Sequence, residues 1–158
     1  MLADDSYRNQ LREEPVPFIS CLWVVAGGAL GTLLRFLLSE LGSGRAESLP
    51  WSTLIVNVTG CMVIGFVGTL TLAEGRYPLP ENIRLFLMVG FCGGFTTFSA
   101  FSLQTLDLLR TGDAWRAATY IGLSIFLCLG AVWLGHDVAS RFNDHASRIA
   151  QLRIEEDA

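Results

Sequence analysis

The chain has 158 residues, of which 51% are hydrophobic and only 16% are charged. Its mean hydropathy of +0.45 is too high for a soluble domain of this length, and the length itself is typical of one domain. The formal net charge of −4 carries little information, because most charged residues lie in the two terminal segments. No basic patch with interleaved aromatic residues occurs, which argues against nucleic acid as a partner.

Four apolar runs follow a polar N-terminal tail, 1–17, which has neither the apolar core nor the cleavage site of a secretory signal. A helix needs about 20 residues to cross the hydrocarbon core, and each run is long enough. The sequence therefore predicts an all-α membrane protein with four transmembrane helices and both termini on one side. A charged C-terminal tail, 139–158, is expected to be either a short helix or disordered. The four spans are predicted at about 18–41, 52–73, 83–109 and 114–138.

The arginines near the span ends give no clear orientation, although cytoplasmic loops normally carry an excess of Arg and Lys. The side of the membrane that carries the termini has as many arginines near the span ends as the opposite side. Only arginines farther from the spans favour cytoplasmic termini. Insertion in both orientations, or dual topology, is therefore a hypothesis. Four helices alone also enclose little space, so a polar path would need two or more copies. The balanced residues are Arg12, Arg76, Arg84 and Arg141 on one side and Arg35, Arg45, Arg110 and Arg116 on the other.

The third run contains the stretch GFCGGFTTFSAFSLQ, 90–104, which places glycines and hydroxyls at membrane depth. One interpretation is a broken helix, with a first segment to about Cys92 and a second from about Thr97. Carbonyls freed by such a break are ligands for a hard cation such as Na⁺. The alternative is that the glycines only thin an intact helix where a neighbour crosses it.

Several polar or aromatic side chains inside the spans are candidates for an ion pathway, each with a simpler structural explanation. Phe98 and Phe101 could present positive ring edges to an anion, or could merely pack. Asn57 could line a pathway or form an interhelical hydrogen bond. Arg35 could mark a pathway or extend to the interface. The fourth run carries a further candidate, a polar stripe formed by residues one helical turn apart: Tyr120, Ser124 and Cys128.

The inventory of buried groups indicates which ion it suits. Hydroxyls, amides and ring edges offer hydrogen-bond donors, and no Asp or Glu lies in the central part of any span. A desolvated ion needs replacement donors along its whole route, so this set favours a small hydrated anion. No nucleophile–base pair or metal-ligand spacing is present, and the four cysteines, one per run, are interpreted as packing residues.

Three segments resemble the Fluc (CrcB) family of fluoride channels: GFCGGFTTFSAFS in the third run, TLIVNVTG in the second and GGALGTLLRF in the first. The resemblance covers about 18–138. It implies a dual-topology, antiparallel homodimer with two fluoride pores, passive fluoride export and no enzymatic activity. It also implies a multi-pass protein of the bacterial cytoplasmic (inner) membrane.

The resemblance assigns roles to individual residues. The backbone carbonyls of Gly93 and Thr96 would hold a structural Na⁺ at the dimer interface. Phe98 and Phe101 would be the pore phenylalanines, and Asn57 the pore amide. The other residues implied along the fluoride pathway are Thr53, Ser99, Ser102, Tyr120, Ser124 and Arg35.

Four positions depart from the family pattern: Phe95, Ala100, Gln104 and Cys128 stand where Leu, Thr, Glu and Ser are usual. The departures at Gln104 and Cys128 affect the far end of the polar track, the row of polar side chains that the resemblance implies along the fluoride pathway. Two other functions are considered. A proton-coupled exporter of organic cations would need a carboxylate within the membrane, whereas a non-transporting assembly subunit would tolerate substitution of Asn57 and the phenylalanines.

Overall fold

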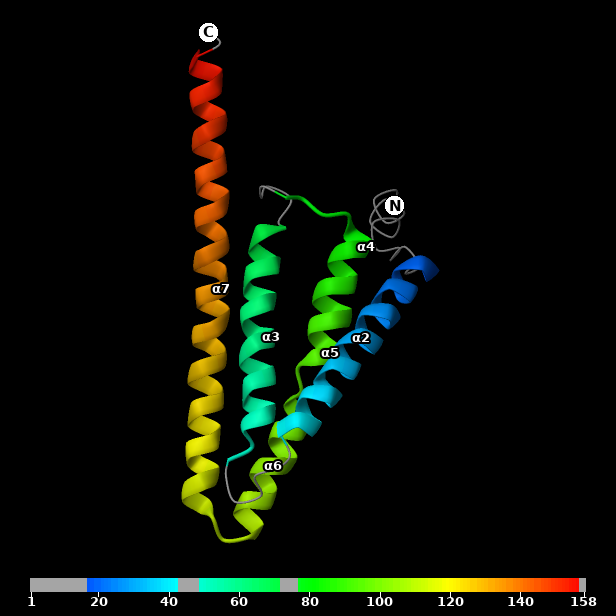
Figure 1. Cartoon of the computed structure of the whole chain (residues 1–158), viewed down its shortest axis with the longest axis vertical. Helices are drawn as coiled ribbons and strands as arrows, with labels where there is room; N and C mark the ends of the chain where they lie inside the picture. Colours follow the sequence, from blue (N-terminus) through cyan, green and yellow to red (C-terminus); the bar gives the residue numbers. More distant parts are fainter. Residues whose placement is uncertain (1–16, 43–48, 72–76, 157–158) are drawn as a thin grey trace, which may run out of the picture.

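The computed structural model describes residues 17–42, 49–71 and 77–156, with side chains described as far as Asn143. Nearly all of the predicted N-terminal tail and several of the arginines counted above, such as Arg45 and Arg76, lie outside the described residues. The helices are α2 (Phe18–Gly42), α3 (Trp51–Leu70), α4 (Glu81–Arg84), the π-helix η1 (Leu85–Cys92), α5 (Gly93–Phe95), α6 (Phe98–Arg110) and α7 (Ala114–Glu156) (Figure 1).

Four stretches are long and apolar enough to cross a membrane, which confirms the predicted number of spans. They are Phe18–Leu41, Trp51–Leu70, Glu81–Arg110 and Ala114–Asn143. α2 begins and α7 ends on the same side, as predicted (Figure 1). The chain is therefore an all-α, multi-pass integral membrane protein.

The last helix is longer than its apolar run. α7 continues past Val138 to Glu156 as one helix of 43 residues and projects well beyond the other helices (Figure 1). No Gly or Pro follows Gly135 to interrupt it. An ion pair of 2.8 Å between Arg141 and Asp137, one turn apart, supports the helix where it leaves the apolar run.

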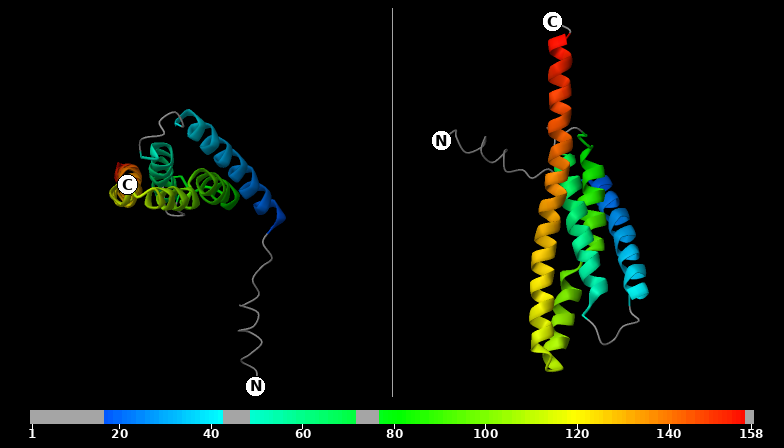
Figure 2. Two further views of the ribbon diagram at one scale, coloured as in Figure 1. Left: turned by 90° about the horizontal axis from the view of Figure 1, so that it is seen from below. Right: turned by 60° about the vertical axis from the view of Figure 1, so that its left-hand side comes forward.

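The third span changes its neighbours halfway along. Its first half, η1 and α5, packs along α2, whereas its second half, α6, packs on α7. Among the described residues, α6 makes no contact with α2, and η1 makes none with α7. α3 lies between the two halves of the molecule and packs along α7 for most of its length (Figures 1 and 2).

The packing of α2 on the third span depends on two glycines, Gly27 and Gly31, that bring the two backbones together. A Cβ at Gly31 would overlap the Phe91 carbonyl oxygen and lie 2.9 Å from the Phe95 amide nitrogen. A Cβ at Gly27 would likewise overlap the Phe86 carbonyl oxygen. In hydrocarbon, close backbone contact of this kind supplies much of the association between helices.

Substituting Gly31 by Ala should therefore destabilise the protein, because the added methyl group meets fixed backbone rather than a movable side chain. The expected loss is about 1–3 kcal/mol, the usual cost of overpacking. It would appear as a lower midpoint of thermal unfolding in detergent. Gly130→Ala is the matched control, since a Cβ there meets no atom within 4 Å, and it should not lower the midpoint, because Ala is favoured over Gly within a helix. Equal midpoints for the two variants would contradict the proposed backbone contact.

Candidate functional site

The third span is interrupted at two threonines. Thr96 (φ −81°, ψ 157°) and Thr97 (φ −151°, ψ 113°) are extended, so α5 ends at Phe95 and α6 begins at Phe98. This confirms the broken helix, but the first segment runs three residues beyond the predicted end at Cys92. Gly93 and Gly94 remain helical, so the glycine pair does not itself form the break.

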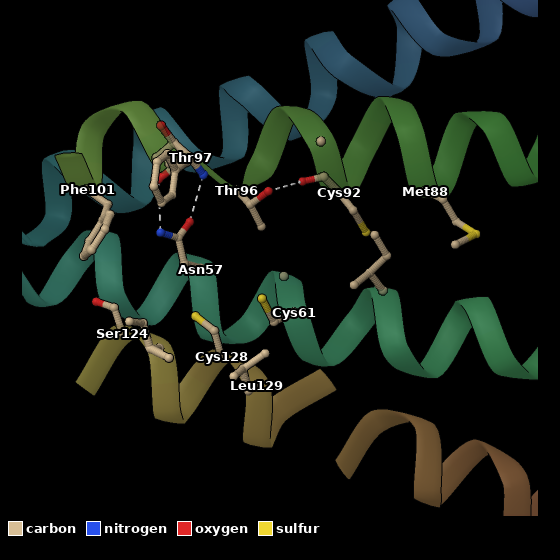
Figure 3. Close-up of a pocket in the computed structure, with 15 residues that line it drawn as sticks. Asn57, Cys61, Met88, Cys92, Thr96, Thr97, Phe101, Ser124, Cys128 and Leu129 are labelled. Carbon is tan, nitrogen blue, oxygen red and sulfur yellow. Dashed lines mark hydrogen bonds between the residues drawn. The ribbon is translucent and has the colours of Figure 1, made fainter. Parts of the chain in front are cut away.

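Asn57 of α3 satisfies the peptide groups of Thr97. The Thr97 N–H donates to Asn57 Oδ1 at 2.8 Å, and Asn57 Nδ2 donates to the Thr97 carbonyl at 3.1 Å (Figure 3). In a continuous helix, this N–H would instead bond the Gly93 carbonyl. Because an unpaired peptide group in hydrocarbon costs several kcal/mol, one side-chain amide makes the extended conformation tolerable at this position.

The threonine hydroxyls complete the two helix ends at the break. Thr96 Oγ1 donates to the Cys92 carbonyl at 2.9 Å, and Thr97 Oγ1 accepts from the Ala100 N–H at 3.2 Å as an N-cap. In a continuous helix, the Ala100 N–H would instead donate to the Thr96 carbonyl. The carbonyls of Gly93 and Thr96 therefore each lose their usual helical donor, and these are the two oxygens assigned above to a cation.

Arg35 reaches the same break from α2. Its Nε donates to the Gly94 carbonyl at 3.1 Å, and Thr32 Oγ1 lies 3.4 Å from that oxygen. The sequence did not predict this contact, because the spacing of residues does not show which backbone groups a distant arginine meets. The guanidinium group thus brings positive charge to the interrupted helix.

A second polar cluster joins α3, α6 and α7 through Gln104. The Tyr120 hydroxyl donates to Gln104 Oε1 at 2.9 Å, and Gln104 Nε2 donates to Thr53 Oγ1 at 2.9 Å. Tyr120 is 0% exposed and Thr53 is 5% exposed. The sequence related Gln104 to the far end of the polar track, as a departure from a family pattern, but did not predict its partners. Its position three residues after Phe101, on the same helical face, was the signal that could have placed it here.

A cavity of about 450 Å³ lies between α3, α7 and the break (Figure 3). Six of the predicted pathway and cation residues line it: Asn57, Phe98, Phe101 and Ser124, together with Gly93 and Thr96, which border the break. Within the described part of the chain, Ser124 Oγ is buried without a hydrogen-bond partner. A free hydroxyl facing a cavity is available to bind a ligand or water.

Three aromatic rings, those of Phe98, Phe101 and Tyr120, form a row whose Phe98 end is exposed on the surface of this chain. The Phe98 and Phe101 ring centroids are 5.4 Å apart, and those of Phe101 and Tyr120 are 5.2 Å apart, with tilted planes in both pairs. Phe98 is 78% exposed. Ser99 and Ser102 are also exposed and do not line the cavity; Ser102 Oγ donates to the Phe98 carbonyl at 2.9 Å. One copy of the chain therefore does not enclose Phe98, Ser99 and Ser102.

The site can offer neutral donors and carbonyl oxygens. Among the described residues, no three His, Cys, Asp or Glu side chains are grouped closely enough to hold a metal ion. A hard monovalent cation requires only oxygen ligands, and carbonyls released from a helix break supply them. The residues present therefore fit a carbonyl-bound Na⁺ and a small anion better than a transition metal.

Comparisons with known proteins agree with this picture. The sequence model of a family described as CrcB-like protein, Camphor Resistance (CrcB), matches residues 22–136. Three similar curated proteins each carry the name "Fluoride-specific ion channel FluC". The chain is 55% identical to the one from Methylobacterium radiotolerans over 140 residues, which cover 89% of this chain and 98% of that protein. It is 57% identical to the one from Gluconobacter oxydans over 143 residues (89% and 99%) and 51% identical to the one from Methylocella silvestris over 123 residues (77% and 94%).

Asn57→Leu should destabilise the protein, because it removes the partners of both Thr97 peptide groups at once. Each unsatisfied buried group costs about 1–3 kcal/mol, so thermal unfolding in detergent should show a clearly lower midpoint. Thr59→Val, an exposed position on the same helix, is the control and should leave the midpoint unchanged. A wild-type midpoint for Asn57→Leu would show that the break does not depend on this amide.

Proposed function

The chain belongs to the CrcB family, and from this membership and the geometry of the site we propose that it is a fluoride-specific ion channel. The observation that carries the proposal is sequence identity. More than half of the aligned residues of this chain are identical to those of proteins named as fluoride channels, over almost the whole length of those proteins. The channel is passive and acts on no covalent bond. An inside-negative membrane potential drives an anion outward by about 2.3 kcal/mol per 100 mV, so passive flow lowers cellular fluoride.

The pathway that we infer runs beside α6, past the cavity. Fluoride leaving water needs donors at each step, because an unpaired ion in low dielectric costs tens of kcal/mol by Born estimates. Ser124 has a free hydroxyl in the cavity, and the Phe98 and Phe101 rings have positive edges. These donors are neutral, so they can bind fluoride without holding it as tightly as a fixed cation would.

The competing function of a proton-coupled exporter has no support from the site. That function needs a carboxylate inside the membrane. Asp107 lies close to the end of α6 and is exposed, and Asp137 is paired with Arg141 near the end of the fourth span. The cavity lining contains no carboxylate.

A second copy of the chain completes the pathway. Phe98, Ser99 and Ser102 are exposed on α6, so one copy of the chain leaves this side of the inferred pathway open. A partner in the opposite orientation would cover them and bring two helix breaks together, which gives two pathways per dimer. The balanced arginines favour such antiparallel pairing. Labelling of the termini on one side only of sealed cells would contradict it.

A structural Na⁺ between the two copies is the cofactor that we propose. The Gly93 and Thr96 carbonyls would hold it, since the Thr97 and Ala100 N–H groups that would bond them in a helix are engaged elsewhere. When bound, the ion compensates the negative ends of carbonyl dipoles at the dimer interface. The chain's own residues fix those carbonyls by holding Thr97 extended.

Phe98→Ile should reduce fluoride efflux from liposomes, read with a fluoride electrode, by at least about tenfold, because it removes a ring edge from the pathway. Phe126→Ile is a matched control: both phenylalanines are 78% exposed, but Phe126 lies on α7 and does not line the cavity. Efflux through the control should stay at the wild-type rate. Equal rates for both variants, with the dimer intact by gel filtration, would refute the pathway.

Removal of Na⁺ should lower the thermal stability of the dimer. An ion present at about 100 times its Kd stabilises the bound state by about 2.7 kcal/mol, and this contribution would disappear on exchange into Na⁺-free buffer. Prolonged dialysis is required because a buried ion leaves slowly. Restoring Na⁺, but not an equal concentration of K⁺, should restore the midpoint. An unchanged midpoint, together with elemental analysis that finds no retained Na⁺, would contradict the site.

A further inference from the structure

Two cysteine thiols face one another across the cavity. Cys61 of α3 and Cys128 of α7 both line it, and their side chains point into the space between the two helices (Figure 3). Cys61 follows Asn57 by one helical turn, and Cys128 follows Ser124 by one turn. The thiol pair therefore continues the polar faces of both helices, directly beyond the amide and the free hydroxyl.

We propose that Cys61 and Cys128 form a two-thiol binding site for the mercuric ion, and that its occupancy closes the neighbouring fluoride pathway. The second half of this inference rests on the proposed channel function. The sequence placed Cys128 on the polar stripe of the fourth run and otherwise indicated packing roles for the cysteines, so a metal-binding role is new for both residues.

The ligand set selects the class of metal. Thiol sulfurs prefer soft metal ions over hard ones. A tetrahedral zinc site needs about four protein ligands, whereas no group of three metal-binding side chains is assembled among the described residues. A soft ion that is satisfied by two opposed sulfurs fits what the cavity offers. Cys92 also lines the cavity but is 2% exposed in η1, which leaves Cys61 and Cys128 as the accessible pair.

The binding step is an exchange without oxidation or reduction. Mercuric chloride reacts with two thiols to give a sulfur–mercury–sulfur bridge; two S–H and two Hg–Cl bonds break, and two S–Hg bonds form. Two protons and two chloride ions leave to water. The bridged product is neutral like the two thiols that it replaces, so no net charge is added to the low-dielectric cavity.

The bridge would obstruct conduction for two reasons. It places a heavy atom in the cavity beside Asn57 and Ser124, where the inferred pathway passes. It also removes both S–H donors from that part of the wall, and a desolvated anion depends on a continuous series of donors.

The experiment uses the full chain carrying Cys21→Ser and Cys92→Ser, so that only the two proposed thiols remain. Mercuric chloride is added at one equivalent, and intact-mass spectrometry and fluoride efflux from liposomes are measured on the same preparation. The expected mass gain is one mercury less two hydrogens, with efflux reduced by at least about tenfold relative to the same preparation without metal. Further substitution of Cys61 or Cys128 by Ser should leave only a chloride-retaining mercury adduct. The same equivalent of Zn²⁺ should not inhibit.

Each contrary result bears on a different part of the inference. Two separate mercury chloride adducts, or equal inhibition of the chain that also lacks Cys61 and Cys128, would overturn the two-thiol site. A bridged mass with undiminished efflux would overturn closure of the pathway. Absence of fluoride efflux before any metal is added would instead refute the channel function, while the bridged mass would still support the metal site.

Discussion

The fold depends on one contact, the paired hydrogen bonds between the Asn57 amide and the Thr97 peptide groups. Hydrocarbon provides no water to satisfy an extended segment, so a two-residue interruption of a transmembrane helix needs partners from the protein itself. Asn57 supplies a donor and an acceptor together from α3, and Arg35 supplies a further donor from α2 to the Gly94 carbonyl. The break is therefore a junction that ties three helices together as well as a gap in one of them.

The junction also explains why the third span has two sets of neighbours. One helical segment ends before Thr96 and the next begins after Thr97, so the two segments need not share an axis. The segment before the break packs against the glycine face of α2, and the segment after it packs on α7. A single straight helix could not make both contacts. The break leaves the face of α6 that carries Phe98 exposed, and this is the face that the proposed partner would cover.

Sequence reasoning found the four spans, the break and six of the fifteen residues that line the cavity, because apolar length and local threonine and glycine content are properties of the chain in isolation. It placed the break too early, since Gly93 and Gly94 looked like helix breakers. Both are helical, and at Gly94 the missing side chain lets α2 approach closely: a Cβ there would lie 2.6 Å from the Gly28 carbonyl oxygen. The contacts of Arg35 and Gln104 were missed for the same reason, because both partners are distant in sequence.

The hydrogen bonds inside the site separate residues that can bind an ion from residues that hold others in place. Tyr120 already donates its only O–H to Gln104, so it would have to break that hydrogen bond before meeting fluoride. Thr53 takes part in this cluster as an acceptor from Gln104. Ser124 Oγ has no such bond to any described residue. The Tyr120 ring also packs beside Phe101. The Gln104 cluster therefore holds Tyr120 in place beside Phe101. In the proposed pathway, the Ser124 hydroxyl and the ring edges are the donors that no hydrogen bond to a described residue occupies.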